Sequence, residues 1–139
     1  MQRLSTKQIR ALLTEHSIRP TRQRLALAVR LFSGPHRHLT AEALHREVIE
    51  EGHNVSLATV YNTLNHFHAL GLLREVTLTA GSTWFDTNTE HHFHYFHEET
   101  GKLWDADPSD FGPVSLAGLP EGTELSRLDV VVRVRTKRS

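Results

Sequence analysis

Apolar residues recur at intervals of three and four positions in four stretches before Gly71, the spacing that places them on one face of an α-helix. Ser or Thr stands at the start of each stretch, where its side chain can cap a helix, and chain breakers stand at the ends. The predicted helices open at Ser5, at Pro20 and Thr21, at Thr40 and at Ser56, and they end near His16, Ser33, Gly52 and Gly71.

The last two of these helices are amphipathic, with polar faces of different character. The third is expected to turn inward Ala41, Leu44, Val48 and Ile49. The fourth is expected to bury Leu57, Val60, Tyr61, Leu64 and Phe67, and to expose Ala58, Thr59, Asn62, Thr63 and His66. The exposed face of the fourth helix is therefore small, polar and without acids.

After Gly71 the pattern changes to the alternation of half-buried strands. Residues 72–79 and 83–86 predict a hairpin, and residues 91–99 and 102–107 predict a second pair of strands that turns at Gly101. A Pro/Gly/Ser-rich connector, residues 108–122, leads to a last strand whose apolar face is Leu128, Val130, Val132 and Val134.

These elements predict an α+β fold of two parts. Residues 1–85 would form a winged helix-turn-helix domain, and residues 86–139 a small C-terminal α/β domain that binds metal and dimerises. A three-stranded sheet of this size is marginal alone, so its apolar face most simply packs against a second copy. We therefore expect a homodimer that forms through residues 88–139.

Composition narrows the class of protein. The chain has 139 residues and no cysteine, which excludes disulfides, iron–sulfur clusters and cysteine-ligated zinc. The net charge is zero, but residues 1–83 carry ten Lys+Arg against six Asp+Glu, and residues 84–139 carry six against ten. The expected partners are a polyanion for the first half and a cation for the second. The sequence lacks a signal peptide and any apolar run that spans a bilayer, so we expect a cytoplasmic protein without membrane contact.

Four of the eleven histidines fall within residues 91–97. In an extended strand His92 and His94 share a face, and with Asp86 and Asp105 nearby that face offers two nitrogens and two carboxylates. Nitrogen and oxygen ligands suit a divalent first-row metal such as Fe²⁺ or Mn²⁺ in cells, or Zn²⁺ in vitro. Solvated or hydrogen-bonded histidines are the plain alternative, but the density of the cluster favours metal ligands.

The fourth helix has two interpretations. A polar outer face is common on ordinary surface helices, and by itself it does not indicate DNA binding. Three features favour double-stranded DNA: the absence of acids on that face, side chains short enough to approach base edges, and the basic residues Arg19, Arg22 and Arg24 on a neighbouring element.

Several motifs resemble the ferric uptake regulator family in their order and spacing. They are RPTRQR at 19–24, HLTAEAL at 38–44, SLATVYNTLNHFHALGLL at 56–73, WFD at 84–86 and the histidine run. Within the family, NTLNHFHALGLLREV, FDTNTEHHFHYF and LPEGTELSRLDVVVRVRTK are more similar to the iron response regulator branch, the haem-responsive repressors of some bacteria. The resemblance implies a dimeric transcription regulator that senses metal or haem and binds operator DNA.

The resemblance also implies roles for particular residues. The sensing site between the two domains falls on His38, Asp86, His92, His94 and Asp105. The residue that enters the minor groove falls on Arg19, and the base-facing positions fall on Tyr61 and Asn62, although the apolar pattern turns Tyr61 inward. The candidate DNA-binding residues are Arg19, Arg24, Ser56, Thr59, Tyr61 and Asn62.

Some positions depart from the family pattern. His97 and Thr100 stand where many members have the first CxxC pair of a structural zinc site, so that site is lost. The secondary metal site keeps His91, but Phe93 replaces its carboxylate. Without cysteine, haem would need histidine or tyrosine as axial ligands, and the candidates are His91, His92, His94 and Tyr95.

Two other functions are compatible with the histidine cluster. A metal-dependent hydrolase would use it catalytically, but the chain has no HExxH motif and its basic helical half would have no role, so we expect no enzyme. A haem or metal carrier that does not touch DNA would leave Arg19–Arg24 and the fourth helix without a role. Salt-dependent binding to duplex DNA separates a carrier from a regulator.

Overall fold

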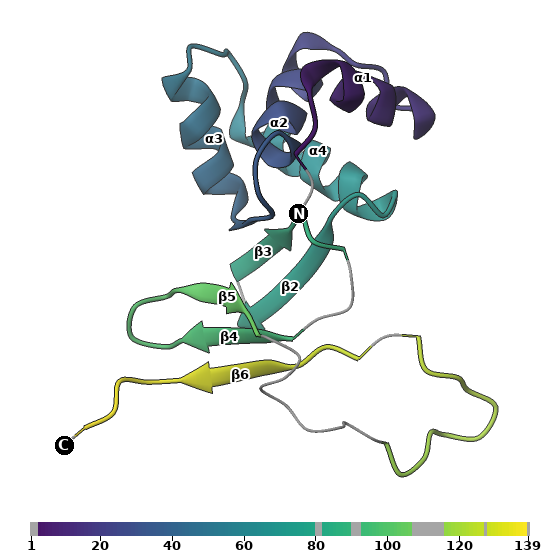
Figure 1. Ribbon diagram of the computed structural model, residues 1–139, viewed down its shortest axis with the longest axis vertical. Helices are drawn as coiled ribbons and strands as arrows, with labels where there is room; N and C mark the ends of the chain where they lie inside the picture. Colours follow the sequence, from purple (N-terminus) through teal and green to yellow (C-terminus); the bar gives the residue numbers. More distant parts are fainter. Residues whose placement is uncertain (1–2, 80–81, 90–92, 107–115, 127, 139) are drawn as a thin grey trace. The chain divides into compact units, whose positions relative to one another are not determined.

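The computed structural model describes residues 3–79, 82–89, 93–106, 116–126 and 128–138. The chain divides into two compact units, Met1–Thr89 and Glu90–Ser139. Asp86, which the sequence analysis assigned to the C-terminal part, lies in the N-terminal unit. Each unit is described by itself (Figure 1).

The N-terminal unit contains the helices α1 (Thr6–Glu15), α2 (Arg22–Phe32), α3 (Ala41–Glu50) and α4 (Leu57–Ala69). Their N-caps are Ser5, Thr21, Thr40 and Ser56, whose side chains accept hydrogen bonds from the backbone N–H three residues later. Gly52 and Gly71 follow α3 and α4 with φ of 93° and 81°, the left-handed conformation that ends a helix. The predicted helix boundaries are confirmed.

The packed faces differ from the prediction at three residues. Ile49 is 44% exposed and Leu57 is 36% exposed, whereas Thr63 is only 7% exposed. Ile49 lies one position beyond the stripe that ends at Val48, and Leu57 lies in the first turn of α4, ahead of its packed part. Thr63 is three residues after the buried Val60, so it falls within the inward stripe.

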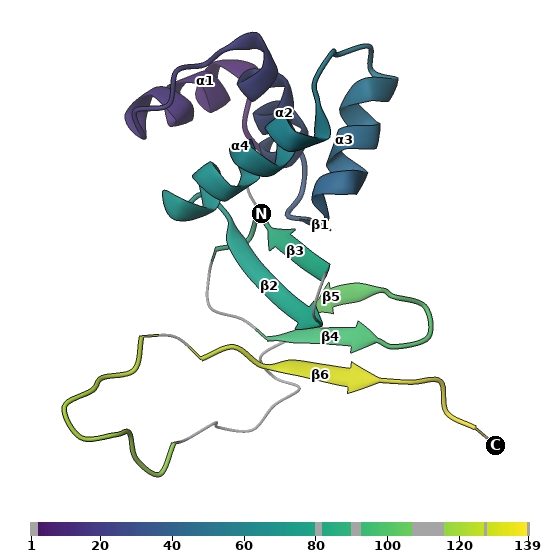
Figure 2. The same ribbon diagram turned by 180° about the vertical axis from the view of Figure 1, so that it is seen from behind.

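One hydrophobic core unites the helices with the sheet of this unit. Within this core, the centroids of the Phe32 and Phe67 rings lie 6.2 Å apart. The fully buried side chains of the core include Ile9, Leu13, Leu27, Leu31, Leu44, Val48, Val60, Leu64 and Phe85. This core packs α4 against α2 and α3 (Figure 2). The polar residues Asn62, Asn65 and His66 of α4 stay exposed.

The wing is the hairpin of β2 (Arg74–Thr79) and β3 (Ser82–Asp86), as predicted. A third strand, β1 (His38–Leu39), pairs with the other side of β3, and the sheet order is β1-β3-β2. No strand was predicted at His38, because a two-residue strand is too short to produce an alternating pattern. Helices followed by this hairpin form a winged helix.

The C-terminal unit contains β4 (His94–His97), β5 (Leu103–Asp105) and β6 (Val131–Val134). Strand β4 pairs antiparallel with β5 and parallel with β6, so the order is β5-β4-β6. Gly101 turns the β4–β5 hairpin with φ of 73°, as predicted. In β6, Val132 and Val134 are half-buried and Arg133 is exposed, which fits the predicted alternation.

Candidate metal-binding pairs and a candidate nucleic-acid interface

The sheet of the N-terminal unit brings His38 next to Asp86. Strands β1 and β3 pair so that these two residues are directly opposite each other, and opposed residues on antiparallel strands point to the same face. His38 Nε2 lies 3.0 Å from Asp86 Oδ2, with the side chains 13% and 0% exposed. A buried carboxylate thus faces an imidazole, and both groups are metal ligands by chemistry.

Residues beside His38 hold β1 in place. The Arg37 N–H donates to Thr87 Oγ1 at 2.9 Å, and the Thr87 N–H donates to the Arg37 carbonyl at 3.1 Å. The Arg37 guanidinium donates twice to the Glu47 carboxylate on α3, at 2.8 and 2.6 Å. The strand is therefore attached to both β3 and α3, which limits the positions open to the His38 ring.

The Arg37–Glu47 pair predicts a dependence of stability on pH. The hydrogen bonds from Arg37 hold the pKa of Glu47 below its ordinary value of 4.5. Because the folded pKa is the lower one, the stabilisation is complete above pH 4.5 and is lost as the pH falls through the folded value. Glu47→Gln should lower the free energy of unfolding by about 1 kcal/mol at neutral pH.

Urea unfolding, followed by helical circular dichroism, measures this effect. In strong acid the difference between Glu47→Gln and the unaltered protein should disappear, since the carboxyl group is then protonated. Glu50→Gln, at an exposed position of the same helix, is the matched control. A Glu47→Gln difference that is equal at neutral and acid pH would contradict the ion-pair interpretation.

The C-terminal unit contains a second pair of the same kind. Strands β4 and β5 place His94 directly opposite Asp105, and His94 Nε2 lies 3.5 Å from Asp105 Oδ1. The His94 side chain is 5% exposed and that of Asp105 is 37% exposed. Each unit therefore offers one imidazole and one carboxylate from opposed positions on antiparallel strands. Such donors fit a divalent first-row metal, as the sequence predicted.

The other members of the histidine run have different positions. His91 and His92, predicted as haem and metal ligands, lie outside the described residues. Tyr95, a haem candidate, is half-buried, with its ring 5.4 Å from that of Trp104. His97 has a structural contact: its Nδ1 accepts from the N–H groups of Glu99 and Thr100 at 3.3 and 3.2 Å. The turn between β4 and β5 is therefore held by this imidazole.

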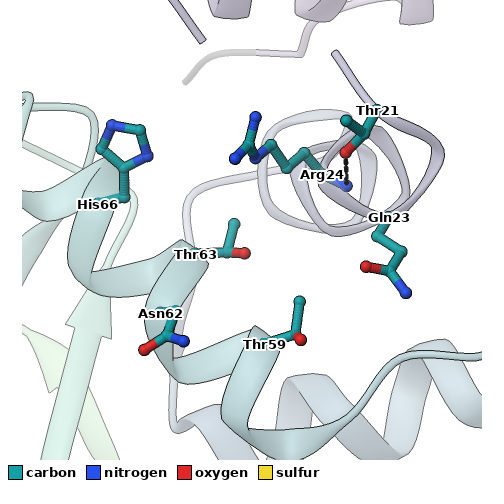
Figure 3. Close-up of a pocket in the computed structure, with 7 residues that line it drawn as sticks. All are labelled: Thr21, Gln23, Arg24, Thr59, Asn62, Thr63 and His66. Atoms are coloured by element: carbon teal, nitrogen blue, oxygen red, sulfur yellow. Dashed lines mark hydrogen bonds between the residues drawn. The ribbon is translucent and has the colours of Figure 1, made fainter. Parts of the chain in front are cut away.

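An open polar pocket of about 550 Å³ lies between the start of α2 and the surface of α4 (Figure 3). It brings together three predicted DNA-binding residues, Arg24, Thr59 and Asn62. Thr21, Gln23, Thr63 and His66 line it as well, although none of them was predicted to contact DNA. A signal was present, since residues 59, 62, 63 and 66 follow one another at helical spacing.

Two further candidates lie beside this pocket. Arg19 is exposed, and its carbonyl accepts from the Thr21 N–H at 2.8 Å and from Arg24 Nη1 at 3.2 Å. These bonds fix the backbone of Arg19 in the segment before α2. Ser56 acts as the N-cap of α4: its hydroxyl accepts from the Thr59 N–H at 3.1 Å and donates to Thr59 Oγ1 at 2.9 Å.

Tyr61 does not line the pocket with Asn62. Its side chain is half-buried and packs against the core, as the apolar pattern predicted, while its hydroxyl donates to the carboxylate of Glu42 on α3. Helix α4 itself contains no Asp or Glu, but the fold places Glu42 of α3 beside it. Periodicity along one helix cannot reveal an acid that a neighbouring helix supplies.

None of the helices in the described part of the chain combines the length and the apolar character that crossing a membrane requires.

The N-terminal unit is a winged helix with a polar surface on α4, and the C-terminal unit carries a His/Asp pair that suits a divalent metal. The profile of the ferric uptake regulator family matches residues 15–111. The chain belongs to the ferric uptake regulator family. This family consists of regulators and not of enzymes, which answers the hydrolase alternative.

Individual relatives agree with this assignment. The peroxide-responsive repressor PerR of Staphylococcus aureus is 38% identical over 95 residues, which cover 68% of this chain and 64% of that protein. The chain thus matches less than two-thirds of the length of that relative. The ferric uptake regulator of Pseudomonas aeruginosa, solved with manganese, is 26% identical with a TM-score of 0.70, over 92% of this chain and 97% of that one. The Vibrio cholerae ferric uptake regulator has the same fold at 21% identity, with a TM-score of 0.71 over 91% of this chain and 98% of that chain.

Proposed function

We propose that this protein is a metal-responsive transcription regulator that binds operator DNA as a homodimer. One observation supports the proposal most strongly: each unit has a His/Asp pair at opposed positions on antiparallel strands. The candidate DNA-reading helix lies in only one of the two units. An ion bound by both pairs would couple the strand unit to the DNA-binding unit. A metal carrier that does not bind DNA would not need ligand pairs in two separate units.

The proposed metal site consists of His38, Asp86, His94 and Asp105, with His92 as the further ligand predicted from the sequence. A bound metal would supply positive charge that neutralises the carboxylates of the two pairs. The chain's own residues orient the ligands: the Arg37 contacts with Thr87 and Glu47 fix β1, and the pairing with β5 fixes His94. Residues 1–85 form the proposed DNA-binding domain, which also supplies His38 to the metal site, and residues 86–139 form the proposed metal-binding and dimerisation domain.

Dimerisation is proposed through the strand unit. Strand β6 lies at one end of the β5-β4-β6 order, and Val132 and Val134 remain half-buried in a single chain. A second copy of the chain is the simplest cover for these valines. Two DNA-binding units would then meet two half-sites of an operator.

The finer proposal concerns the ligand. We assign iron or manganese to the site in cells, and we place the chain in the iron response regulator branch because of its histidine-rich motifs. In that branch haem is the second ligand, and His94 and Tyr95 are its candidates in the described residues. The manganese in the Pseudomonas aeruginosa relative belongs to that protein, but it supports a site of nitrogen and oxygen ligands. A regulator of chromosomal DNA works in the cytoplasm.

One titration tests the proposal. Duplex DNA selected from a random library by the Mn²⁺-loaded protein is titrated with apo, Mn²⁺-loaded, Fe²⁺-loaded and haem-loaded protein at several salt concentrations. We expect affinity to depend on the bound ligand and to fall steeply with salt, because phosphate contacts release counterions. Equal affinity of all four forms for the selected DNA would exclude a sensor, and no binding would favour a carrier.

Asn62 and Arg19 should have distinguishable effects in this assay. Asn62 is exposed at the open pocket, so Asn62→Ala should cost about 1 to 3 kcal/mol on the selected operator and relax the preference for one base. Arg19→Ala should weaken binding to all sequences more evenly, because its charge acts on the phosphate backbone or the minor groove. An equal loss across all sequences for both variants would argue against base reading by Asn62.

A further inference from the structure

The contact between Tyr61 and Glu42 joins the two helices that a winged helix brings to DNA. Glu42 lies in the first turn of α3, and its carboxylate accepts the hydroxyl proton of Tyr61 on α4. The ring of Tyr61 packs against the hydrophobic core. Tyr61 is therefore held at both ends, by the core at its ring and by Glu42 at its hydroxyl.

The charges of this pair are well defined at neutral pH. The hydrogen bond from Tyr61 lowers the pKa of Glu42, and the backbone N–H of Glu42 and the charge of Arg46 lower it further. The same hydrogen bond raises the pKa of Tyr61. The carboxylate is thus ionised and the phenol keeps its proton. A phenol has a single proton to donate, so once that proton is given to Glu42 only oxygen lone pairs remain.

We propose that Glu42 is a positioning residue that determines specificity: by holding the hydroxyl proton of Tyr61, it makes Tyr61 a hydrogen-bond acceptor towards DNA. This inference rests on the proposed function, in which α4 reads the major groove. Tyr61 lies in the N-terminal half of α4, the part of a recognition helix that meets base edges. In the major groove, hydrogen-bond donors are the amino groups of adenine and cytosine, so Tyr61 selects one of these bases.

The charge of Glu42 has a second consequence. No residue of α4 is acidic, so the carboxylate that α3 supplies is a fixed negative charge beside the reading helix. Phosphates repel this charge on any sequence, whereas only the correct base compensates for it through Tyr61. Glu42 therefore weakens binding to non-specific DNA more than binding to the operator.

Titration of the phenol tests the contact without DNA. The chain has two tyrosines, so the difference between the unaltered protein and Tyr61→Phe isolates the absorbance change of Tyr61. Glu42→Gln should shift the pKa of Tyr61 down towards its ordinary value of 10.0. Glu50→Gln makes the same charge change at the other end of α3 and should leave that pKa in place. Equal pKa values in the two glutamine variants would overturn the inference and leave the proposed function untouched.

Selection of DNA tests the consequence for specificity. The Mn²⁺-loaded protein selects sites from a random duplex library, and each variant is then compared on selected and unselected DNA. Tyr61→Phe should lose about fivefold preference at one base pair, the size of one hydrogen bond. Glu42→Gln should lose the same preference, because an amide can donate as well as accept, and should bind unselected DNA about threefold more tightly.

The double variant Glu42→Gln, Tyr61→Phe should lose no more preference than Tyr61→Phe alone, since both changes remove one interaction. The specificity role of Glu42 would be overturned if Glu42→Gln had the same base preference as Glu50→Gln, or if Tyr61→Phe kept the preference of the unaltered protein. Either result would still allow α4 to read DNA. An unaltered protein that selects no sequence would remove both this inference and the proposed function.

Discussion

His94→Ala is expected to weaken metal binding by more than about 100-fold and to remove the metal dependence of operator binding. Among the described residues of the strand unit, His94 is the buried histidine, with its side chain 5% exposed and its Nε2 3.5 Å from the Asp105 carboxylate. Alanine leaves Asp105, which lies at a more exposed position, as the remaining ligand of that pair. A single exposed carboxylate holds a divalent metal weakly, because water competes for the ion.

Calorimetric titration of the protein with Mn²⁺ measures this loss. His53→Ala is the matched control, since it removes a half-buried imidazole from the N-terminal unit outside both His/Asp pairs. The control should bind Mn²⁺ as the unaltered protein does. The loss expected for a metal ligand is much larger than about twofold. If the Mn²⁺ affinity of His94→Ala stays within about twofold of the control, His94 is not a ligand of the proposed site.

Much of the N-terminal unit could be predicted because its signals are local. Ser5, Thr21, Thr40 and Ser56 cap the helices within three residues of themselves, and Gly52 and Gly71 end two helices through their own backbone conformation. The antiparallel hairpins were equally visible, since their turns and alternating residues are adjacent in sequence. Local chemistry of this kind needs no knowledge of the neighbouring elements.

The two His/Asp pairs show the limit of such reasoning. Composition identified the residue types, but the pairing of His38 with Asp86 depends on a register between segments 48 positions apart in the chain. The two-residue strand β1 exists because Arg37 and Thr87 bond to each other and because Glu47 holds Arg37. None of these contacts produces a periodic pattern of residues in the sequence.

Helix packing produced the remaining differences. Ile49 and Leu57 are apolar residues at the margin of an inward stripe, where the neighbouring helices do not reach, so they stay exposed. Thr63 is polar but falls inside the stripe of α4 and is buried. Glu42 reaches Tyr61 only because α3 and α4 pack side by side. In our proposal, specificity depends on the contact between Glu42 and Tyr61, and this contact forms only in the packed fold. The helices α3 and α4 themselves depend less on tertiary structure.

His38→Ala should leave metal binding in place but remove the effect of the metal on DNA binding. His38 belongs to the unit that contains α4, whereas His94 and Asp105 belong to the other unit. Removing His38 leaves the C-terminal pair and Asp86 to hold a metal with reduced affinity. A metal can shift the DNA-competent population only through a difference in its affinity for the two arrangements of the units. Without His38 that difference is lost, although binding of the ion continues.

The measurement is operator affinity with and without saturating Mn²⁺. In the unaltered protein we expect at least about a tenfold effect of the metal, in the range of ordinary coupling free energies. In His38→Ala the effect should fall below about twofold, with the affinity of the metal-free protein for DNA unchanged. His36→Ala is the matched control, because it removes an imidazole from the same segment, one that contacts Thr87 at 3.3 Å instead of Asp86. If His38→Ala keeps the full metal dependence at saturating Mn²⁺, the metal does not act through the N-terminal pair, and the proposed coupling between the units is wrong.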